Sequence, residues 1–231
     1  MSAVLALSDE QMYERMVCAI LDHKLPPGTK LVEDKLASAF GVSRTRVRPV
    51  LVRLANEQIV TLTPNRGAAV AQPTVKEAHE VFQVRRMIEP TLVEMFIAAA
   101  HQADMDALAQ CIEEEEAERA GGDTRRAIRL AGDFHLHIAQ VAGHQTLGRI
   151  LRELVSRTSL ILMTYGDNGA GVTRCGCRDH RALLNAVRLR DAKEAGHIMR
   201  EHLSGLESRL RFAPPADDDA PDLARLFGIA A

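Results

Sequence analysis

The sequence predicts a mainly α-helical protein. Its first part is a winged helix-turn-helix of three helices with a small β wing, and its second part is an antiparallel all-helical bundle. Two observations predict this class. Hydrophobic residues make up 46% of the 231 residues and aromatic residues only 3%, so the core must be built from Ala, Leu, Ile, Val and Met, a composition that favours helix. Proline and glycine interrupt the chain often up to Pro73, whereas from there to Pro214 the only proline is Pro90.

This punctuation divides the chain into three segments. We expect a first domain at residues 1–74, an all-helical domain at 75–212 with breaks near Gly121 and Gly143, and a mobile tail at 213–231. No apolar run approaches the length of a membrane span, and the N-terminus lacks the features of a secretion signal. We therefore expect a cytoplasmic protein with no membrane partner.

Helical periodicity and turn residues define the elements of the first domain. Apolar residues recur at helical spacing over 9–21 and again over 32–40, and Gly41 permits a tight turn. Ser43 is a good N-cap for a third helix. Two short apolar runs, 59–62 and 68–70, bracket a Pro-Asn-Arg-Gly turn, which predicts a two-stranded wing.

Positive charge gathers in this domain although the whole chain has a net charge of −2. Between Lys30 and Arg66 there are seven basic and three acidic residues, an excess of four positive charges. The start of the third helix places hydroxyl and guanidinium groups where backbone N–H groups and the helix dipole also favour phosphate, and the arginines can reach guanine edges in a major groove. The residues concerned are Ser43, Arg44, Thr45, Arg46 and Arg48, with Arg66 at the wing tip. A small helical domain that merely displays arginines is the alternative.

The run from Pro27 to Arg48 resembles the DNA-binding domain of the GntR family. The resemblance rests on Pro-Gly-x-Lys-Leu-x-Glu-x-x-Leu-Ala-x-x-Phe-Gly-Val-Ser-Arg-Thr-x-Val-Arg, followed by Leu51, Leu54 and Arg66-Gly67. It implies that Ser43, Arg44, Thr45, Arg48, Arg66 and Gly67 contact an operator in double-stranded DNA. Pro49 stands where the family usually has an acidic residue, and a proline at this position should bend the helix.

The second domain is similar to the FadR-like branch, whose effector domain is called FCD. The similarity rests on Val-Arg-Arg-Met-Ile-Glu at 84–89, Phe-His at 134–135, Asp-His-Arg at 179–181 and Arg-Glu-His-Leu at 200–203. It implies an antiparallel bundle with a central cavity, a homodimer that reads a palindromic operator, and a small organic acid as effector.

Three histidines on three separate predicted helices are candidate metal ligands: His135, His180 and His202. Converging helices can direct them to one point, and such an imidazole set suits Zn or Ni. By resemblance they match the metal-binding histidines of FCD domains, although Ala131 stands where the family usually has an Asp or Asn ligand. The alternative is that they are polar groups satisfied inside a cavity.

Two further groups of charged residues have simpler interpretations. Arg85 and Arg86 are candidate contacts for an acidic effector, or partners of Glu89 in a structural salt bridge. The run from Glu113 to Glu116 is interpreted as a solvated helix face.

The sequence therefore predicts a transcription regulator, more often a repressor in such a family, and not an enzyme. A metal-dependent hydrolase built on the three histidines is an alternative, but no His-Glu-x-x-His motif supplies a general base. An architectural DNA-binding protein without an effector is the other alternative, and it would have no need of a histidine cluster.

Overall fold

The computed structural model describes residues 7–64, 66–166 and 171–212, with the side chains of 171–176 left aside. Their contacts divide into two compact units, one ending at Gln72 and one beginning at Pro73, each of which is treated by itself. The tail proposed at 213–231 lies outside the described residues. None of the described helices is long and apolar enough to cross a membrane.

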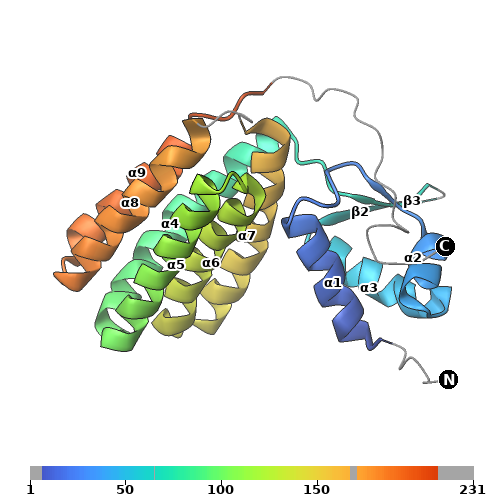
Figure 1. Cartoon of the computed structure of the whole chain (residues 1–231), viewed down its shortest axis with the longest axis horizontal. Helices are drawn as coiled ribbons and strands as arrows, with labels where there is room; N and C mark the ends of the chain where they lie inside the picture. The colour runs from blue at the N-terminus through green and yellow to red at the C-terminus, as the bar shows by residue number, and fades with distance from the viewer. Residues whose placement is uncertain (1–6, 65, 167–170, 213–231) are drawn as a thin grey trace. The chain divides into compact units, whose positions relative to one another are not determined.

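The first unit is a helix-turn-helix with a small antiparallel sheet (Figure 1). Both α1 and α2 pack against α3, and buried methionine and leucine side chains fill the space between them. The elements run in the order α1 (Asp9–Leu21), β1 (Lys30–Leu31), α2 (Glu33–Phe40), α3 (Arg44–Asn56), β2 (Val60–Thr63) and β3 (Gly67–Val70).

Local chemistry explains where these helices begin and end. Ser8 and Gln11 form a capping box at the start of α1. Gly41 ends α2 in the left-handed conformation, with φ 63°, which a residue without Cβ adopts readily. Ser43 does occupy the N-cap of α3, but its hydroxyl lies 2.7 Å from Thr45 Oγ1 and makes no capping hydrogen bond.

The predicted two-stranded wing was incomplete. Strands β2 and β3 do form a hairpin, with Thr63 opposite Gly67. Strand β1 adds a third strand to the sheet, in the order β1-β3-β2. Lys30 pairs with Ala69 and Leu31 with Ala68. Two residues are too few to give a period-two signal, so only the long-range pairing defines this strand.

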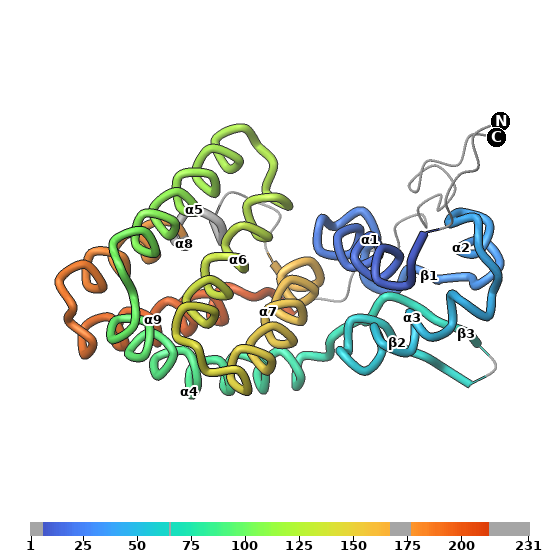
Figure 2. Tube along the Cα trace, turned by 90° about the horizontal axis from the view of Figure 1, so that it is seen from below, coloured from blue at the N-terminus to red at the C-terminus, as the bar shows by residue number. Residues whose placement is uncertain are grey.

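The second unit is an antiparallel bundle of amphipathic helices (Figures 1 and 2). A capping box between Thr74 and Glu77 begins its first helix. Glycines at 121 and 143 end two of the helices, as predicted. The helices are α4 (Val75–Ala99), α5 (Gln102–Ala120), α6 (Thr124–Ala142), α7 (Gln145–Tyr165), α8 (Gly171–Arg188) and α9 (Ala192–Glu207).

Within this bundle α6 packs against both α4 and α5, and the first helix, α4, packs against the last, α9 (Figure 2). Phe82, Phe96 and Phe134 are fully buried in the core between them. Because α8 also contacts α5, α6 and α9, five helices surround one central region, and side chains distant in sequence meet there.

Helix α3 continues through Pro49, which lies in its interior. An interior proline removes one backbone hydrogen bond and strains the preceding turn. Pro49→Ala should therefore raise the free energy of unfolding by about 1–3 kcal/mol, measured by urea denaturation. Val52→Ala, at another exposed position of the same helix, is the control and should change stability by less than about 0.5 kcal/mol. No gain from Pro49→Ala would show that α3 accommodates the ring without cost.

Candidate functional site

The first turn of α3 presents an exposed polar face. Ser43, Arg44, Thr45 and Arg48 are exposed, whereas Val47, one position before Arg48, is buried against the other helices. This separation follows from the helical period, which turns neighbouring side chains by about 100°. The face is therefore free to meet another molecule.

Two arginines of this face are paired with the acidic first turn of α2. Arg44 Nε lies 2.8 Å from Asp34 Oδ1, and Arg48 Nε donates to both oxygens of Glu33 at 3.0 and 2.9 Å. Ion pairs exposed to water contribute about 0–1 kcal/mol each. A phosphate or a base edge can therefore replace either carboxylate at little cost.

Arg46 differs from its neighbours because it holds the start of α1. Its Nη2 donates to Leu7 O at 2.7 Å and to Asp9 Oδ1 at 2.8 Å. At the wing, Arg66 and Gly67 are both exposed, and Gly67 has a φ of 83° at the start of β3. The wing tip and the α3 face thus remain accessible, whereas the Arg46 guanidinium is already engaged.

The three predicted histidines converge inside the bundle. His135 on α6, His180 on α8 and His202 on α9 are 3%, 1% and 4% exposed, and one ring nitrogen from each lies within 4.8 Å of the others. Phe134 stacks on His180 with a centroid separation of 4.2 Å and fixes that ring. His137, two residues after His135, faces Phe96 instead.

Each histidine is held through Nδ1 by a carboxylate from another helix. His135 Nδ1 lies 2.5 Å from Glu89, His180 Nδ1 lies 2.9 Å from Glu115, and His202 Nδ1 lies 3.3 Å from Asp179. A neutral imidazole that donates from Nδ1 carries its lone pair on Nε2. The Nε2 atoms of His180 and His202 are buried, with no hydrogen-bond partner among the described residues.

Burial and charge determine the protonation states of this centre. Burial lowers the pKa of His135 to about 4 and that of His202 to about 3, so both rings are neutral at pH 7. Burial alone would raise the pKa of Glu89 and Glu115, but neighbouring positive charge and hydrogen bonds hold both at about 2. With His135 neutral, the lasting positive charge beside Glu89 is Arg85, whose Nε donates to it at 2.5 Å.

Arg85 and Arg86 point in different directions. Arg85 is 2% exposed and adjoins the histidines through Glu89, and its Nη1 donates to Thr158 Oγ1 on α7 at 3.1 Å. Arg86 instead pairs with Glu207 at the end of α9, which also contacts His79. Only Arg85 of the two lies beside the histidine centre.

The prediction that the run from Glu113 to Glu116 is a solvated helix face is wrong for one of its residues. Glu115 is 0% exposed and holds His180, while Glu116 pairs with the exposed Arg181. The helical period is the signal that was missed, because four consecutive residues span more than one turn and one of them must face the core. Glu89 and Asp179 are further contributing residues that sequence reasoning did not assign to the centre.

These residues fit a divalent metal ion. Three imidazoles fixed at Nδ1 by carboxylates, with the buried Nε2 atoms of His180 and His202 left without a partner among the described residues, have the arrangement by which proteins orient metal-binding histidines. His135, His180 and His202 would be the protein ligands, and the Ala131 side chain offers no ligand atom.

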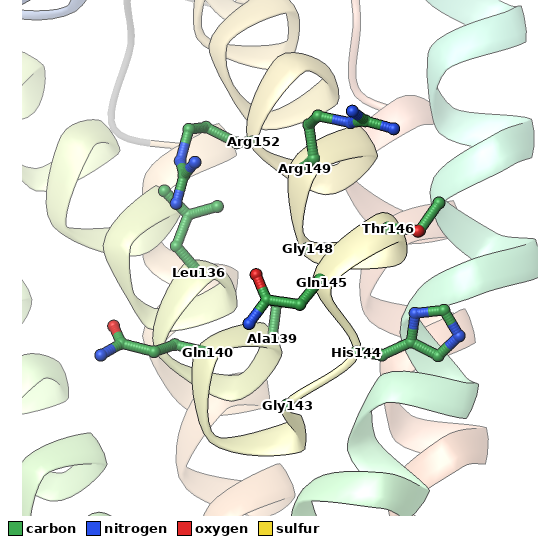
Figure 3. Close-up of a pocket in the computed structure, with 10 residues that line it drawn as sticks. All are labelled: Leu136, Ala139, Gln140, Gly143, His144, Gln145, Thr146, Gly148, Arg149 and Arg152. Atoms are coloured by element: carbon green, nitrogen blue, oxygen red, sulfur yellow. The ribbon is translucent and has the colours of Figure 1, made fainter.

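A shallow pocket of about 600 Å³ lies at the turn between α6 and α7. Figure 3 shows Arg149 and Arg152 on opposite sides of it, with Gln145 between them. Both arginines are exposed. The pocket lacks the enclosed, fixed polar groups of the histidine centre, so we assign it no function.

The comparisons with known proteins agree with the two units. Residues 8–70 match the family described as "Bacterial regulatory proteins, gntR family", and residues 80–205 match the FCD domain. The regulator YdhC of Bacillus subtilis is 25% identical over 84% of this chain and 87% of its own length. The repressor RspR of Escherichia coli is 22% identical over 88% and 89%. The solved structure of E. coli McbR/YncC is similar in fold, with a TM-score of 0.75, 20% identity, and coverage of 88% of this chain and 95% of that one.

A pH dependence follows from the buried rings of the metal-free protein. Below pH 6.5 the unfolded chain protonates His135 and His202, whereas the folded chain does not until about pH 4 and 3. The free energy of unfolding should therefore fall by about 2 kcal/mol per histidine between pH 7 and pH 5. Urea unfolding of chelator-treated protein measures this. Glu89 and Glu115 contribute mainly below pH 4.5, so equal stability at pH 7 and 5 would contradict the assignment.

Proposed function

We propose a function on the premise that this chain belongs to the GntR family of bacterial regulatory proteins, with an FCD domain as its second part. It is a transcription regulator and not an enzyme. The proposal is that it is a repressor whose operator affinity is controlled by an organic acid bound in the helical domain. The observation that carries the effector half is the set of three buried histidines held at Nδ1 by carboxylates.

The DNA half of the proposal rests on the exposed face of α3 and the wing. Ser43, Arg44, Thr45 and Arg48 would enter the major groove with the positive end of the helix, and Arg66 and Gly67 would reach the adjacent backbone or minor groove. Arg46 would act by holding α1 in place, since its guanidinium is bonded to Leu7 and Asp9. The exposed ion pairs of Arg44 and Arg48 support their release to DNA.

The effector half rests on the fit of the histidine centre to Zn or Ni. When bound, such an ion supplies a Lewis-acidic point that attracts a carboxylate. Glu89, Glu115 and Asp179 would keep the rings neutral and oriented. Arg85 would donate to the same acid, since its Nη2 is buried without a partner among the described residues.

We further propose a homodimer that reads a palindromic operator in the cytoplasm. Helix-turn-helix proteins commonly read two half-sites through a two-fold axis. Val84 and Met87 support the dimer, because they lie one turn apart on α4 and are 36% and 69% exposed, apolar surface of the kind a partner covers.

Helix α7 offers a route from the effector centre to the domain boundary. Thr158 accepts a hydrogen bond from Arg85, and two turns later Tyr165 donates from its hydroxyl to the carbonyl of Pro73 at 2.7 Å. Pro73 is the first residue of the second unit. A displacement of α7 by an acid at Arg85 would therefore reach the segment that leads to the DNA-binding unit.

Arg44→Ala and Arg48→Ala should each weaken binding to the operator by tenfold or more, equivalent to at least about 1.4 kcal/mol, while the protein remains folded. Fluorescence anisotropy with operator DNA measures this at a fixed salt concentration. Arg15→Ala removes an exposed arginine of α1 and is the charge-matched control. Unchanged affinity in both α3 variants would refute the proposed DNA-binding face.

His180→Ala should abolish retention of the metal and the response to effector without removing DNA binding by the effector-free protein. Elemental analysis by mass spectrometry should find about one divalent ion per chain in the wild type and none in the variant. His197→Ala, an exposed histidine of α9, is the control. A variant that retains metal and responds normally would make the histidine cluster structural.

Tyr165→Phe removes only the hydrogen bond to Pro73. We expect effector binding and effector-free DNA binding to remain within about twofold of the wild type, while the effect of the acid on DNA affinity falls by about fivefold or more. Titration calorimetry and anisotropy together separate these quantities. Full coupling in the variant would exclude this hydrogen bond as the connection.

A further inference from the structure

Helix α5 carries a largely buried arginine that no recognised motif marks. The Arg119 side chain is 14% exposed. Its Nη2 and Nε both donate to Glu115 Oε1, the latter at 3.2 Å, and Nε also lies 3.0 Å from Cys177 Sγ. The other oxygen of Glu115 holds His180. Arg119 is thus one carboxylate away from the histidine centre.

The same arrangement occurs on α4. Arg85 and Glu89 are four residues apart on one helix, as Glu115 and Arg119 are, and Glu89 in turn holds His135. In both cases the guanidinium and the histidine share one carboxylate. The two arginine–carboxylate pairs lie on different helices, α4 and α5. Both helices pack against α6, which carries His135 (Figure 2).

Each guanidinium leaves one terminal nitrogen without a partner. Arg85 Nη2 and Arg119 Nη1 are buried and have no hydrogen-bond partner among the described residues. A buried donor left unpaired costs about 1–3 kcal/mol, and more when it is charged. Guanidinium groups offer only donors, so a molecule that satisfies them must present acceptor oxygens in two places.

The charges of the centre point to the same class of molecule. Arg85 balances Glu89, and Arg119 balances Glu115, while Asp179 is partly exposed beside Arg178. A divalent ion on the three histidines would add two positive charges, and Ala131 supplies no acid to offset them. Two further negative charges would restore neutrality in a buried region where net charge is costly.

We propose that Arg119 is a second anchor of the effector site and that the effector is a dicarboxylic acid. One carboxylate meets Arg85 and the other meets Arg119. This inference rests on the proposed effector function of the helical domain and narrows it to acids with two anionic ends. Arg119 thereby determines specificity, selecting a dianion over a monoanion.

Titration calorimetry of the full-length, zinc-loaded protein tests the proposal. The probes are the straight-chain dicarboxylates from malonate to adipate, each compared with the monocarboxylate of the same carbon number. At least one dicarboxylate should bind the wild type tenfold or more tightly than its monocarboxylate. Arg119→Gln, compared with the wild type at equal zinc occupancy, should reduce that preference to threefold or less through weaker binding of the dicarboxylate. Arg126→Gln removes an exposed arginine paired with Glu118 and should keep the full preference.

Arg119→Lys retains the charge and covers the case in which Arg119→Gln does not fold; it should show an intermediate preference. Monocarboxylates that bind the wild type as tightly as dicarboxylates would overturn the proposal and leave the effector function standing. A full preference in a folded Arg119→Gln or Arg119→Lys variant would overturn it as well. If neither kind of acid binds while zinc does, both this proposal and the proposed effector function are wrong.

Discussion

The hydrogen bonds between carboxylates and imidazoles at the centre of the bundle are the interaction on which the second domain depends. A buried carboxylate is costly unless it is paired and hydrogen-bonded. Glu89 and Glu115 are each satisfied by an arginine of their own helix and a histidine of another. Loss of an arginine or a glutamate would leave a charge uncompensated in the core, and loss of a histidine would leave a buried carboxylate without one of its hydrogen bonds. The relative positions of α4, α5, α6 and α8 are therefore fixed by electrostatics as well as by apolar packing.

The same kinds of ion pair have the opposite consequence at the surface of the first unit. Arg44 and Arg48 face carboxylates of α2 in contact with water. In a high dielectric the pairs contribute little, so they hold the guanidinium groups in place without competing strongly with phosphate. Burial thus separates a rigid centre suited to retaining an ion from a face suited to exchanging partners.

The two proposed binding events must be coupled in both directions. An acid that lowers the affinity for DNA by a given factor must itself bind less tightly to the DNA-bound protein by the same factor. The contacts of α7 would give this coupling a physical path, because one helix carries both Thr158, which is bonded to Arg85 beside the histidines, and Tyr165, which is bonded to Pro73. A helix transmits displacement along its axis with little internal change, since its backbone hydrogen bonds are made within the segment itself.

The sequence by itself determined the class of the fold, the helices of the helix-turn-helix, and the candidate residues of the α3 face and of the histidine centre. These follow from the helical period, from capping and turn residues, and from a motif whose members lie close together in the chain. It did not define β1, whose two residues become a strand only by pairing with β3. The tertiary structure alone decided which of Arg85 and Arg86 faces the histidines and which glutamate of the run at 113–116 is buried. It also brought Arg119 to the centre. The physical reason is that the sequence specifies local conformation, whereas the orientation of a side chain depends on which helices pack against its own.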